Sequence, residues 1–363
     1  MPDPAPVNEQ LMARLDGHTR TFETLFAEYF DALGGALDTP PFSRFTPECL
    51  GLLRELSLRG GKRIRVVILN EAARLVTGEP VPGLEHAALS LELLHTHGLV
   101  HDDLIDDSPT RRGGPSTYYA YRDRFPHHPR TALGLTVLAG DLALALSLRV
   151  LLDSKAEPPV RQAMIEAQTR AAAETITGQI ADLERDLAAG SPDTEVLYQV
   201  DDFKSARYSL LAPLELGLLA AGEQPACHEG ELRRYARLVG ICAQMRDDYL
   251  DLFGDEEETG KPTGTDLRDG KRSHVVAALL SSLEGAERSV VEACLGDASC
   301  TGERIAVVRE IAEERGVAGR LRAEMRDFAE QAALVAAGWR SRWRGEAVAF
   351  FELLPYRSVE RSR

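Results

Sequence analysis

Several features that define large classes of protein are scarce or missing in this sequence. Basic residues number 42 against 57 acidic ones, the formal net charge is -15, and no stripe of lysine or arginine is present. This balance argues against a nucleic-acid partner and against binding to an anionic membrane surface. No uninterrupted apolar run is long enough to cross a membrane, and the chain begins without a signal-peptide pattern. We therefore expect a soluble, cytoplasmic protein with no transmembrane segment.

Cysteine is scarce as well, with 5 residues in the chain. The number is odd, the residues are scattered, and no two of them form a Cys-x-x-Cys pair. We interpret them as reduced thiols of a cytosolic protein. They are Cys49, Cys227, Cys242, Cys294 and Cys300.

Strand-like alternation and internal repeats are absent too, whereas apolar residues recur at helical spacing. Alanine and leucine dominate these stretches, which favours helix. We predict an all-α, single-domain bundle, in which residues 1–40 form an N-terminal arm and first helix and residues 41–363 form the main helical domain. The principal helices are expected at Leu11 to Leu37, Arg63 to Val76, Leu84 to Asp107, Thr131 to Leu152, 194–221 and 230–253.

Two aspartate-rich motifs stand at the ends of two of these helices, D-D-L-I-D at 102–106 and D-D-Y-L-D at 247–251. Because residues four apart share a helix face, the first and last aspartates of each motif are neighbours and the middle one points aside. Carboxylates stacked on a half-buried face repel each other and are costly to desolvate, and hard divalent cations would offset that cost. Two such faces opposite each other would form a cage for Mg²⁺ and a polyphosphate.

Cationic segments accompany the motifs. G-G-K-R-I-R at 60–65 places cations beside flexible glycines, which suits an anion site that backbone amides can approach closely. T-R-R-G-G at 110–114 places two arginines just past the first carboxylates, where guanidinium groups can clamp an anion that Mg²⁺ neutralises from the other side. His95 precedes Asp102 by seven residues on the same face, and a glycine- and lysine-bearing segment at 260–271 follows the second motif.

Each of these features has a structural interpretation when it is taken alone. A basic triplet is usually a solvated face, a single histidine is more often a core residue than a ligand, and one D-D-x-x-D is a weak signal. Gln179 and Ser205 carry no information by themselves. The joint occurrence of two carboxylate faces, two cationic loops and a lysine-bearing segment favours two anion sites, one of them with metal.

In this combination the sequence closely resembles the trans-isoprenyl diphosphate synthases of the polyprenyl synthetase family, and within it the geranylgeranyl diphosphate synthases. The resemblance runs from about Pro47 to the end of the chain, with its motifs in order and at fitting spacings. It rests on G-G-K-R-I-R at 60–65, E-L-L-H at 92–95, H-D-D-L-I-D at 101–106, R-R-G at 111–113, G-Q-x-x-D at 178–182, K-S at 204–205, Q-M-R-D-D-Y-L-D at 244–251 and G-K-P-T-G-T-D-L-R-D-G-K at 260–271.

The resemblance implies an isoprenoid synthase-type bundle around a central active-site cavity, a homodimer, and three Mg²⁺ ions per active site. It also implies a prenyltransferase reaction between isopentenyl diphosphate and an allylic diphosphate (dimethylallyl, geranyl or farnesyl). The allylic diphosphate ionises, the double bond of isopentenyl diphosphate attacks the carbocation, and loss of a proton gives a chain five carbons longer. We hypothesise that the released diphosphate accepts the proton.

Roles for individual residues follow from the same resemblance. Metal ligation is expected of Asp102, Asp106, Asp247 and Asp251, with Asp103 and Asp248 behind them. Diphosphate binding is expected of Arg111, Lys204 and Lys261, and a metal-free site for isopentenyl diphosphate of Lys62, Arg65, His95 and Arg112. Dipoles that stabilise the cation are expected from Gln179, Ser205 and Gln244, and help in closing a mobile loop from Lys271.

The residues just before the first motif form the pocket floor in this family and set product length. A bulky residue five positions before the motif gives short products, and here that position is His97, followed by Gly98. A floor five helical residues away lies about 7.5 Å below the motif. We expect a C20 product, geranylgeranyl diphosphate, with the C15 farnesyl compound or a longer polyprenyl diphosphate as the alternatives. Val66, Ala243 and Ser205 depart from the usual pattern, but none of them removes a charged group.

Three other interpretations remain open at this point: a terpene cyclase on the same scaffold, a non-catalytic partner subunit, and a structural helical bundle. A cyclase does not need the isopentenyl diphosphate site, which is present here. Partner subunits usually lose aspartates, and both motifs are intact. A structural bundle does not explain why two cationic loops accompany the acidic faces.

Overall fold

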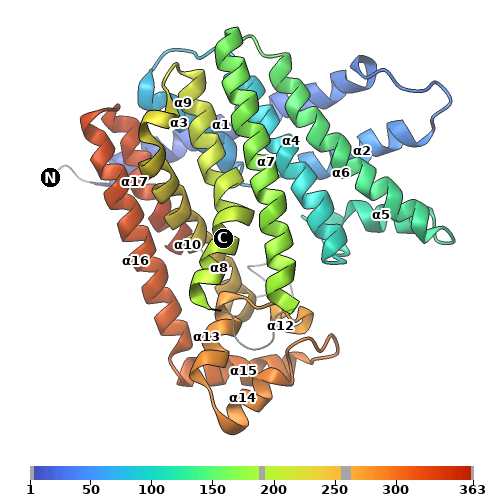
Figure 1. Ribbon diagram of the computed structural model, residues 1–363, viewed down its shortest axis with the longest axis vertical. Helices are drawn as coiled ribbons and strands as arrows, with labels where there is room; N and C mark the ends of the chain where they lie inside the picture. The colour runs from blue at the N-terminus through green and yellow to red at the C-terminus, as the bar shows by residue number, and fades with distance from the viewer. Residues whose placement is uncertain (1–3, 188–192, 255–262, 361–363) are drawn as a thin grey trace. The chain divides into compact units, whose positions relative to one another are not determined.

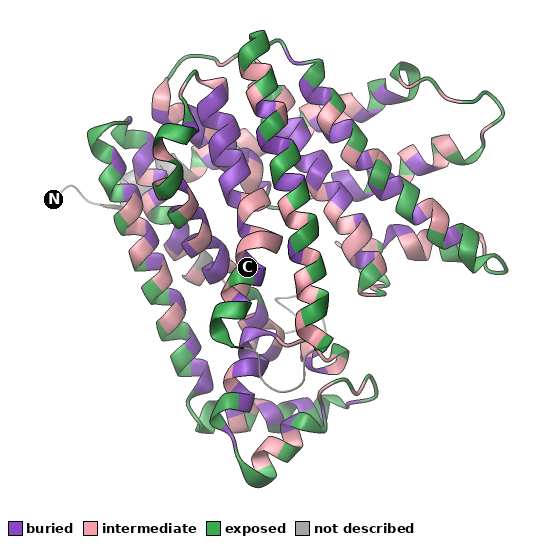
Figure 2. Cartoon of the chain, viewed as in Figure 1, coloured by how far each residue is buried: buried purple, intermediate pink, exposed green. Residues whose placement is uncertain are grey.

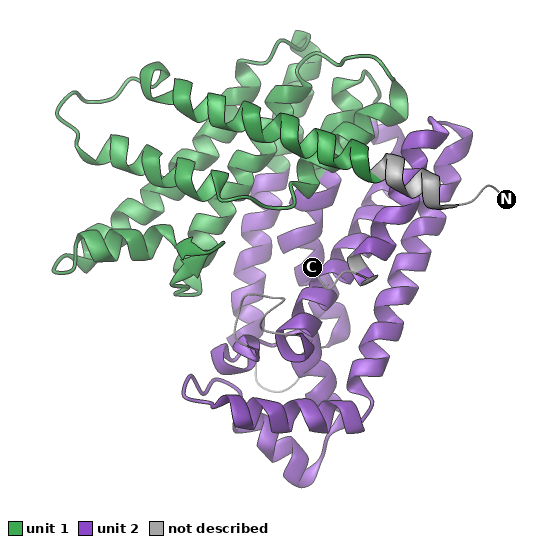
Figure 3. Ribbon diagram, turned by 180° about the vertical axis from the view of Figure 1, so that it is seen from behind, with its two compact units in different colours: residues 1–170, 212–224 green, residues 171–211, 225–363 purple. Residues whose placement is uncertain are grey.

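The computed structural model describes residues 4–187, 193–254 and 263–360, and helices make up most of them (Figure 1). This confirms the predicted all-α class. The described residues divide into two compact units, one made of the segments up to 170 and 212–224 and the other of 171–211 and 225 onward (Figure 3). Helix α7 (Pro158–Leu187) begins in the first unit and continues into the second. A domain boundary at residue 40 stays a prediction.

The first unit is built on two close helix pairs, α4 with α6 and α3 with α9. Small residues make these approaches possible. At Gly140 of α6, a Cβ atom would lie 2.2 Å from His101 Nε2, and at Gly217 of α9 one would lie 2.4 Å from the carbonyl oxygen of Leu69. The elements of this unit besides α7 are α1 (Pro4–Ala36), α2 (Phe45–Leu58), α3 (Ile64–Val76), α4 (Leu84–Ile105), β1 (Thr110–Arg111), β2 (Gly114–Pro115), α5 (Thr117–Arg124), α6 (Pro129–Leu152) and α9 (Ala212–Ala220).

Helix α6 is long and strongly apolar. With 24 residues and a mean hydropathy of 1.9 in its most apolar window, it could cross a membrane by length and composition alone. Core helices of soluble proteins meet the same criterion, and α6 packs its small residues along α4. Its burial pattern is visible in Figure 2.

The second unit is centred on α10, which packs against α16 and η1. Its core joins α10 to α13, α15 and α16 through buried aliphatic residues such as Ile241, Leu279, Val308 and Leu321. The other elements are α8 (Thr194–Asp201), η1 (Asp202–Leu211), η2 (Pro225–His228), α10 (Glu229–Phe253), α12 (Thr265–Asp269), α13 (His274–Ser282), α14 (Gly285–Glu292), α15 (Gly302–Glu314), α16 (Val317–Ala337), η3 (Gly338–Ser341) and α17 (Gly345–Glu360).

Two local features differ from the sequence-based expectation. The helix predicted over 194–221 is interrupted by η1, ten residues of π-helix. The glycine loop after the first motif contains a two-residue antiparallel ladder, in which Arg111 pairs with Gly114. Periodicity could not reveal either one, because a π-helix keeps the apolar character of its neighbours and the ladder is too short to alternate.

Candidate active site

The first aspartate motif ends α4. Asp106 follows the last helical residue, and its amide still donates to the carbonyl oxygen of Asp102 at 2.9 Å. Asp102 and Asp106 are partly exposed, whereas the Asp103 side chain has no exposed surface. The helical turn therefore places the three aspartates as their spacing predicts: the carboxylates of Asp102 and Asp106 are accessible, and that of Asp103 is buried.

Arg111 of β1 is the partner of the buried carboxylate. Its Nε donates to Asp103 Oδ1 at 2.6 Å, and its Nη2 lies 3.4 Å from Asp102 Oδ2. Burial raises the pKa of Asp103, and the hydrogen bond and charge of Arg111 oppose that shift. The guanidinium thus lies directly beside the motif. There it could add a second positive charge for an anion that a cation holds on the exposed carboxylates.

Arg112, the next residue, serves a different group. Its backbone is left-handed with φ 52°, and its Nη2 donates to His95 Nε2 at 3.1 Å. Gly61 allows this position, because a Cβ there would lie 3.1 Å from the Arg112 guanidinium. One tight turn therefore directs two adjacent arginines to two separate places, the first motif and His95.

His95 sits in a strongly positive environment. Burial lowers its pKa well below 6.5, and the charges of Arg65, Arg112, Arg63 and Arg111 lower it further. The imidazole is therefore neutral at physiological pH, and its Nε2 accepts a hydrogen bond. A cluster of guanidinium groups around a neutral histidine has the chemistry to bind an anion without a metal ion. Arg65 projects from α3 and is half-buried, and Lys62, just before the helix, is exposed.

Arg63 is a residue that the sequence did not single out. It is 3% exposed and left-handed, with φ 45°. Its guanidinium donates to Glu92 Oε2 at 2.6 Å, to Glu23 Oε1 at 2.7 Å and to the carbonyl oxygen of Ser57 at 2.6 Å. A basic triplet was expected to be a solvated face when taken alone. Instead Arg63 is buried and links α1, α2 and α4 through its hydrogen bonds. These bonds fix the backbone between Lys62 and Arg65.

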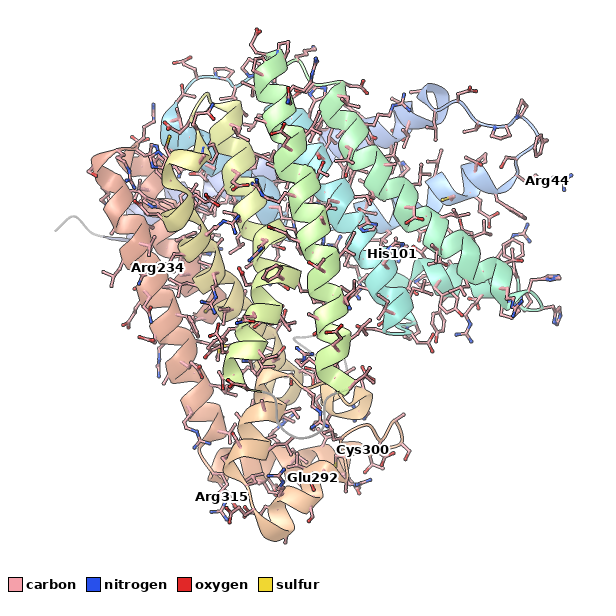
Figure 4. The ribbon with its side chains drawn as sticks, viewed as in Figure 1. Arg44, His101, Arg234, Glu292, Cys300 and Arg315 are labelled. Atoms are coloured by element: carbon pink, nitrogen blue, oxygen red, sulfur yellow. The ribbon has the colours of Figure 1, made fainter. Side chains whose placement is uncertain are left out.

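The two chain-length candidates behave differently. His97 is 6% exposed, and its Nδ1 lies 3.0 Å from the carbonyl oxygen of Gly140 in α6. Its ring also meets that of His101, labelled in Figure 4, at a centroid distance of 4.6 Å. A Cβ added at Gly98 would meet nothing within 4 Å. His97 is therefore fixed against α6, and Gly98 leaves space next to it.

The second motif, on α10, repeats the pattern with different partners. Asp247 has a side chain that is 66% exposed, and Asp248 is 7% exposed. Gln244 Nε2 donates to Asp248 Oδ1 at 2.9 Å, and the backbone amide of His274 donates to Oδ2 at 2.8 Å. The buried carboxylate is thus satisfied by neutral amides, one of them from a residue that was expected to act on the substrate.

Asp251 holds the start of α12. Its Oδ1 and Oδ2 accept from the amides of Thr265 and Asp266, at 3.2 and 3.1 Å, and its carbonyl oxygen accepts from Gly264 at 2.7 Å. Asp266 is a further acidic residue here, and burial together with the charges of Asp248 and Asp251 raises its pKa well above the ordinary value. In the sequence, the only indication of a role for Asp266 is its place within the segment 260–271.

Lys204 and Ser205 lie on the π-helix η1. Lys204 Nζ donates to Asp182 Oδ2 at 2.6 Å, and Arg185 Nη2 lies 2.7 Å from the other oxygen of that carboxylate. The close approach of α7 to η1 depends on Gly178, because a Cβ there would lie 2.3 Å from the Lys204 amide nitrogen. Gln179, next to it, is half-buried. The motif at 178–182 thus has a structural role. Gly178 lets η1 pack closely against α7, and Asp182 pairs with Lys204.

The last two expected anion ligands lie beyond the second motif. Lys271 follows α12, is half-buried, and donates its amide to the carbonyl oxygen of Asp266 at 2.9 Å. Lys261 falls outside the described residues.

Each motif offers accessible carboxylates for a cation. Among the residues that the structure describes, no three His, Cys, Asp or Glu side chains form a group that could hold a metal ion by themselves. Carboxylate oxygens such as those of Asp102 and Asp247 are ligands of the kind that Mg²⁺ prefers in proteins.

Comparison with known proteins gives a consistent result. Residues 47–312 match the family model for polyprenyl synthetase. The chain is 30% identical over 315 residues to farnesyl diphosphate synthase from Geobacillus stearothermophilus, covering 83% of this chain and 96% of the relative. It is 31% identical over 252 residues to geranylgeranyl diphosphate synthase from Sulfolobus acidocaldarius, covering 68% and 71%.

A solved structure agrees with these relatives. The crystal structure of geranylgeranyl pyrophosphate synthase from Corynebacterium glutamicum, complexed with isoprenyl diphosphate and magnesium, is similar with a TM-score of 0.86 and 28% identity. The similarity covers 96% of this chain and 99% of that one. The fold is therefore the all-α isoprenoid synthase fold. The chain belongs to the polyprenyl synthetase family, the trans-isoprenyl diphosphate synthases.

Proposed function

We propose that this protein is a Mg²⁺-dependent, short-chain trans-prenyltransferase that condenses an allylic diphosphate with isopentenyl diphosphate and makes mainly the C20 product, geranylgeranyl diphosphate. The observation that carries this proposal is the turn at Arg111 and Arg112. It supplies one guanidinium to the carboxylate motif and the other to a metal-free cluster around His95. A condensing enzyme must hold two diphosphates at once, and the first unit carries a group of residues suited to each.

The allylic diphosphate is the substrate assigned to the aspartates. Its C1–O bond breaks, and the leaving diphosphate takes the electron pair. Bound Mg²⁺ would neutralise the charge that collects on this group. Asp102, Asp106, Asp247 and Asp251 are the proposed ligands, with Asp103 and Asp248 held behind them by Arg111 and Gln244. Arg111, Lys204, Lys261 and Lys271 are the proposed cationic contacts.

Isopentenyl diphosphate is assigned to the metal-free cluster. Lys62, Arg65 and Arg112 provide charge, and neutral His95 can hydrogen-bond without adding a charge that would titrate near pH 7. The double bond of the bound substrate attacks C1 of the allylic cation. Loss of a proton then restores a double bond, with the released diphosphate as the proposed acceptor. Gln179, Ser205 and Gln244 offer dipoles to the cation but no strong nucleophile that would trap it.

The product assay tests this directly. Purified protein is incubated with Mg²⁺, isopentenyl diphosphate and, in separate reactions, dimethylallyl, geranyl or farnesyl diphosphate, and products are identified by mass. Elongated diphosphates ending at C20 are expected, and light scattering should report a homodimer. Cyclic hydrocarbons would indicate a cyclase, and absence of turnover a partner subunit.

Matched variants tie turnover to the motifs. Asp102→Ala and Asp247→Ala should each lower kcat by roughly 10²- to 10³-fold, because charge stabilisation of the leaving group is lost. Asp107→Asn is the control: Asp107 is exposed, lies just outside the motif and has φ 45°, which asparagine tolerates. Equal activity of the two alanine variants and the control would contradict the assignment.

A further inference from the structure

The buried aspartate of the second motif depends on a residue far along the chain. Asp248 accepts one hydrogen bond from Gln244, on its own helix, and another from the backbone amide of His274, the first residue of α13. Ser273, which precedes α13, makes no side-chain cap to the helix. Asp248 therefore satisfies one of the amides at the start of α13 that have no partner within the helix. The start of α13 and the second motif are tied at this point.

The side chain of His274 reaches a third element. Its Nε2 lies 2.6 Å from Asp201 Oδ2, and both side chains are at most 5% exposed. Asp201 ends α8, directly before the π-helix that carries Lys204 and Ser205. A single residue thus connects the second motif, through its backbone, to the beginning of the lysine-bearing segment, through its imidazole.

The surroundings fix the imidazole in place. Tyr198 stacks on it at a centroid distance of 5.7 Å, packs edge-on against Phe328 and donates its hydroxyl to Glu324 of α16. Burial alone would lower the pKa of His274, but the hydrogen bond and charge of Asp201 outweigh it and raise the pKa, with Asp248 and Glu324 adding to the shift. Burial raises the pKa of Asp201 to about 6, although His274 and Arg185 oppose it. The raised pKa of His274 favours its protonated form, and the 2.6 Å contact joins it to Asp201 in a buried hydrogen bond.

We propose that His274 is a positioning residue that holds the second aspartate motif in register with the segment carrying Lys204. The proposal rests on the proposed function only in that the motif is taken to bind a magnesium diphosphate. His274 touches neither the substrate nor the metal. It fixes the two protein segments that would do so, and the buried Asp201–His274 pair provides the rigidity.

His274→Phe is the principal test, because it keeps the ring that stacks on Tyr198 and removes the hydrogen bond to Asp201. Calorimetric titration of the full chain with inorganic diphosphate in Mg²⁺ should show binding weakened roughly 10- to 100-fold. In turnover assays the KM for the allylic diphosphate should rise and that for isopentenyl diphosphate should stay unchanged. His274→Gln places an amide nitrogen near the position of Nε2 and should restore most of the affinity.

A general loss of stability is separated by a matched control. Tyr235→Phe removes another buried hydrogen bond of α10, from Tyr235 to the carbonyl oxygen of Phe351 at 2.8 Å, away from the motif. It should leave diphosphate binding unchanged, and thermal unfolding should show all variants folded. If His274→Phe unfolds on purification, Asp201→Asn, which keeps the shape of the pair without its charge, is titrated in its place and should weaken binding in the same direction.

The outcomes distinguish the inference from the proposed function. Normal diphosphate binding by folded His274→Phe, or an equal loss in Tyr235→Phe, overturns the positioning role while turnover of the wild type stands. A wild type that binds magnesium diphosphate but elongates no allylic diphosphate overturns the proposed function. In that case, weakened binding by His274→Phe still supports the positioning role. A wild type that does not bind magnesium diphosphate overturns both.

Discussion

The two aspartate motifs share a pattern of letters, but their surroundings are chemically different. In the first, the buried Asp103 is held by the guanidinium of Arg111, and more arginines surround His95 close by. In the second, the buried Asp248 is held by neutral amides, and Asp266 adds another carboxyl group. The buried aspartate of the first motif is therefore paired with a protein cation, and that of the second with neutral donors. Arg246 Nη2 lies 3.3 Å from the neighbouring Asp247, so the cation of the second motif is beside its exposed aspartate.

This difference shows how one repeated motif can serve two electrostatic roles. A region rich in arginine can attract a diphosphate before any metal arrives. At the second motif, the charges of Asp248 and Asp251 raise the pKa of Asp266, and such repulsion between carboxylates favours binding of a divalent cation. On the proposed function, the second motif should determine the magnesium requirement, and the first should determine where the anions settle.

The largest expected effect comes from removing the partner of each buried aspartate. Arg111→Gln leaves Asp103, which has no exposed side-chain surface, buried without a counter-charge, and should lower the free energy of unfolding by about 3–5 kcal/mol. Gln244→Leu removes one of two neutral donors to Asp248 and should lower it by about 1–3 kcal/mol. Urea unfolding of both variants measures the difference. Equal losses would show that the two buried aspartates are held alike.

The next effect concerns the metal-free cluster. Arg112→Gln removes the guanidinium that donates to His95 and should raise the KM for isopentenyl diphosphate roughly 10- to 100-fold, as expected for a charge-assisted hydrogen bond. The KM for the allylic diphosphate should stay within a small factor. Arg122→Gln, which alters an arginine that is 44% exposed in the same unit, is the control. If both substrates lost affinity equally, the assignment of separate sites would fail.

The free energy of unfolding should depend on pH in opposite ways at His95, near the first motif, and at His274, near the second. His95 has a pKa lowered by burial and by arginines, so its contribution is complete above 6.5 and is lost as the pH falls below that value. His274 has a pKa raised by Asp201, so its contribution is complete below 6.5 and is lost as the pH rises through its folded value. Each slope is limited to about 1.4 kcal/mol per pH unit.

Urea titrations between pH 5 and pH 9 measure both slopes. Relative to wild type, His95→Gln should gain stability as the pH falls, and His274→Gln should gain it as the pH rises. The same sign for both variants would contradict the opposite shifts.

The last and smallest expected effect on turnover concerns the pocket floor, where the change appears in the product. His97→Ala removes a bulky ring and should shift the product distribution toward longer chains. Gly98→Ala adds a methyl group where nothing lies within 4 Å and should shift it toward shorter ones without loss of folding. Chromatography of the dephosphorylated products measures the ratio. If neither variant changes chain length, the floor lies elsewhere.

Much of this structure follows from local sequence pattern. The helices that carry the motifs begin and end within a few residues of the predicted positions, because apolar spacing and the glycine and proline breaks agree there. The split of each motif into accessible and buried aspartates also follows from helical geometry alone.

The remainder depends on contacts between residues far apart in sequence. Nothing near Arg63 signals that Glu23 and Glu92 will bury it, and nothing near His274 indicates Asp201. His97 was chosen for its bulk, but its hydrogen bond to α6 depends on the packing of a glycine 43 residues later. These features are set by tertiary packing, to which local periodicity is insensitive.

The π-helix between α8 and α9 has a consequence for comparing this chain with its relatives. A π-helix takes up more residues per turn than an α-helix, so the side chains along η1 do not continue the helical phase of α8. Deleting Phe203 would rotate Lys204 relative to α8 and turn it away from Asp182, although no charged side chain would be lost. Alignments in this segment should therefore be anchored at Gly178 and Gly240, whose missing side chains admit the wide turn, and not extended by helical spacing from either end.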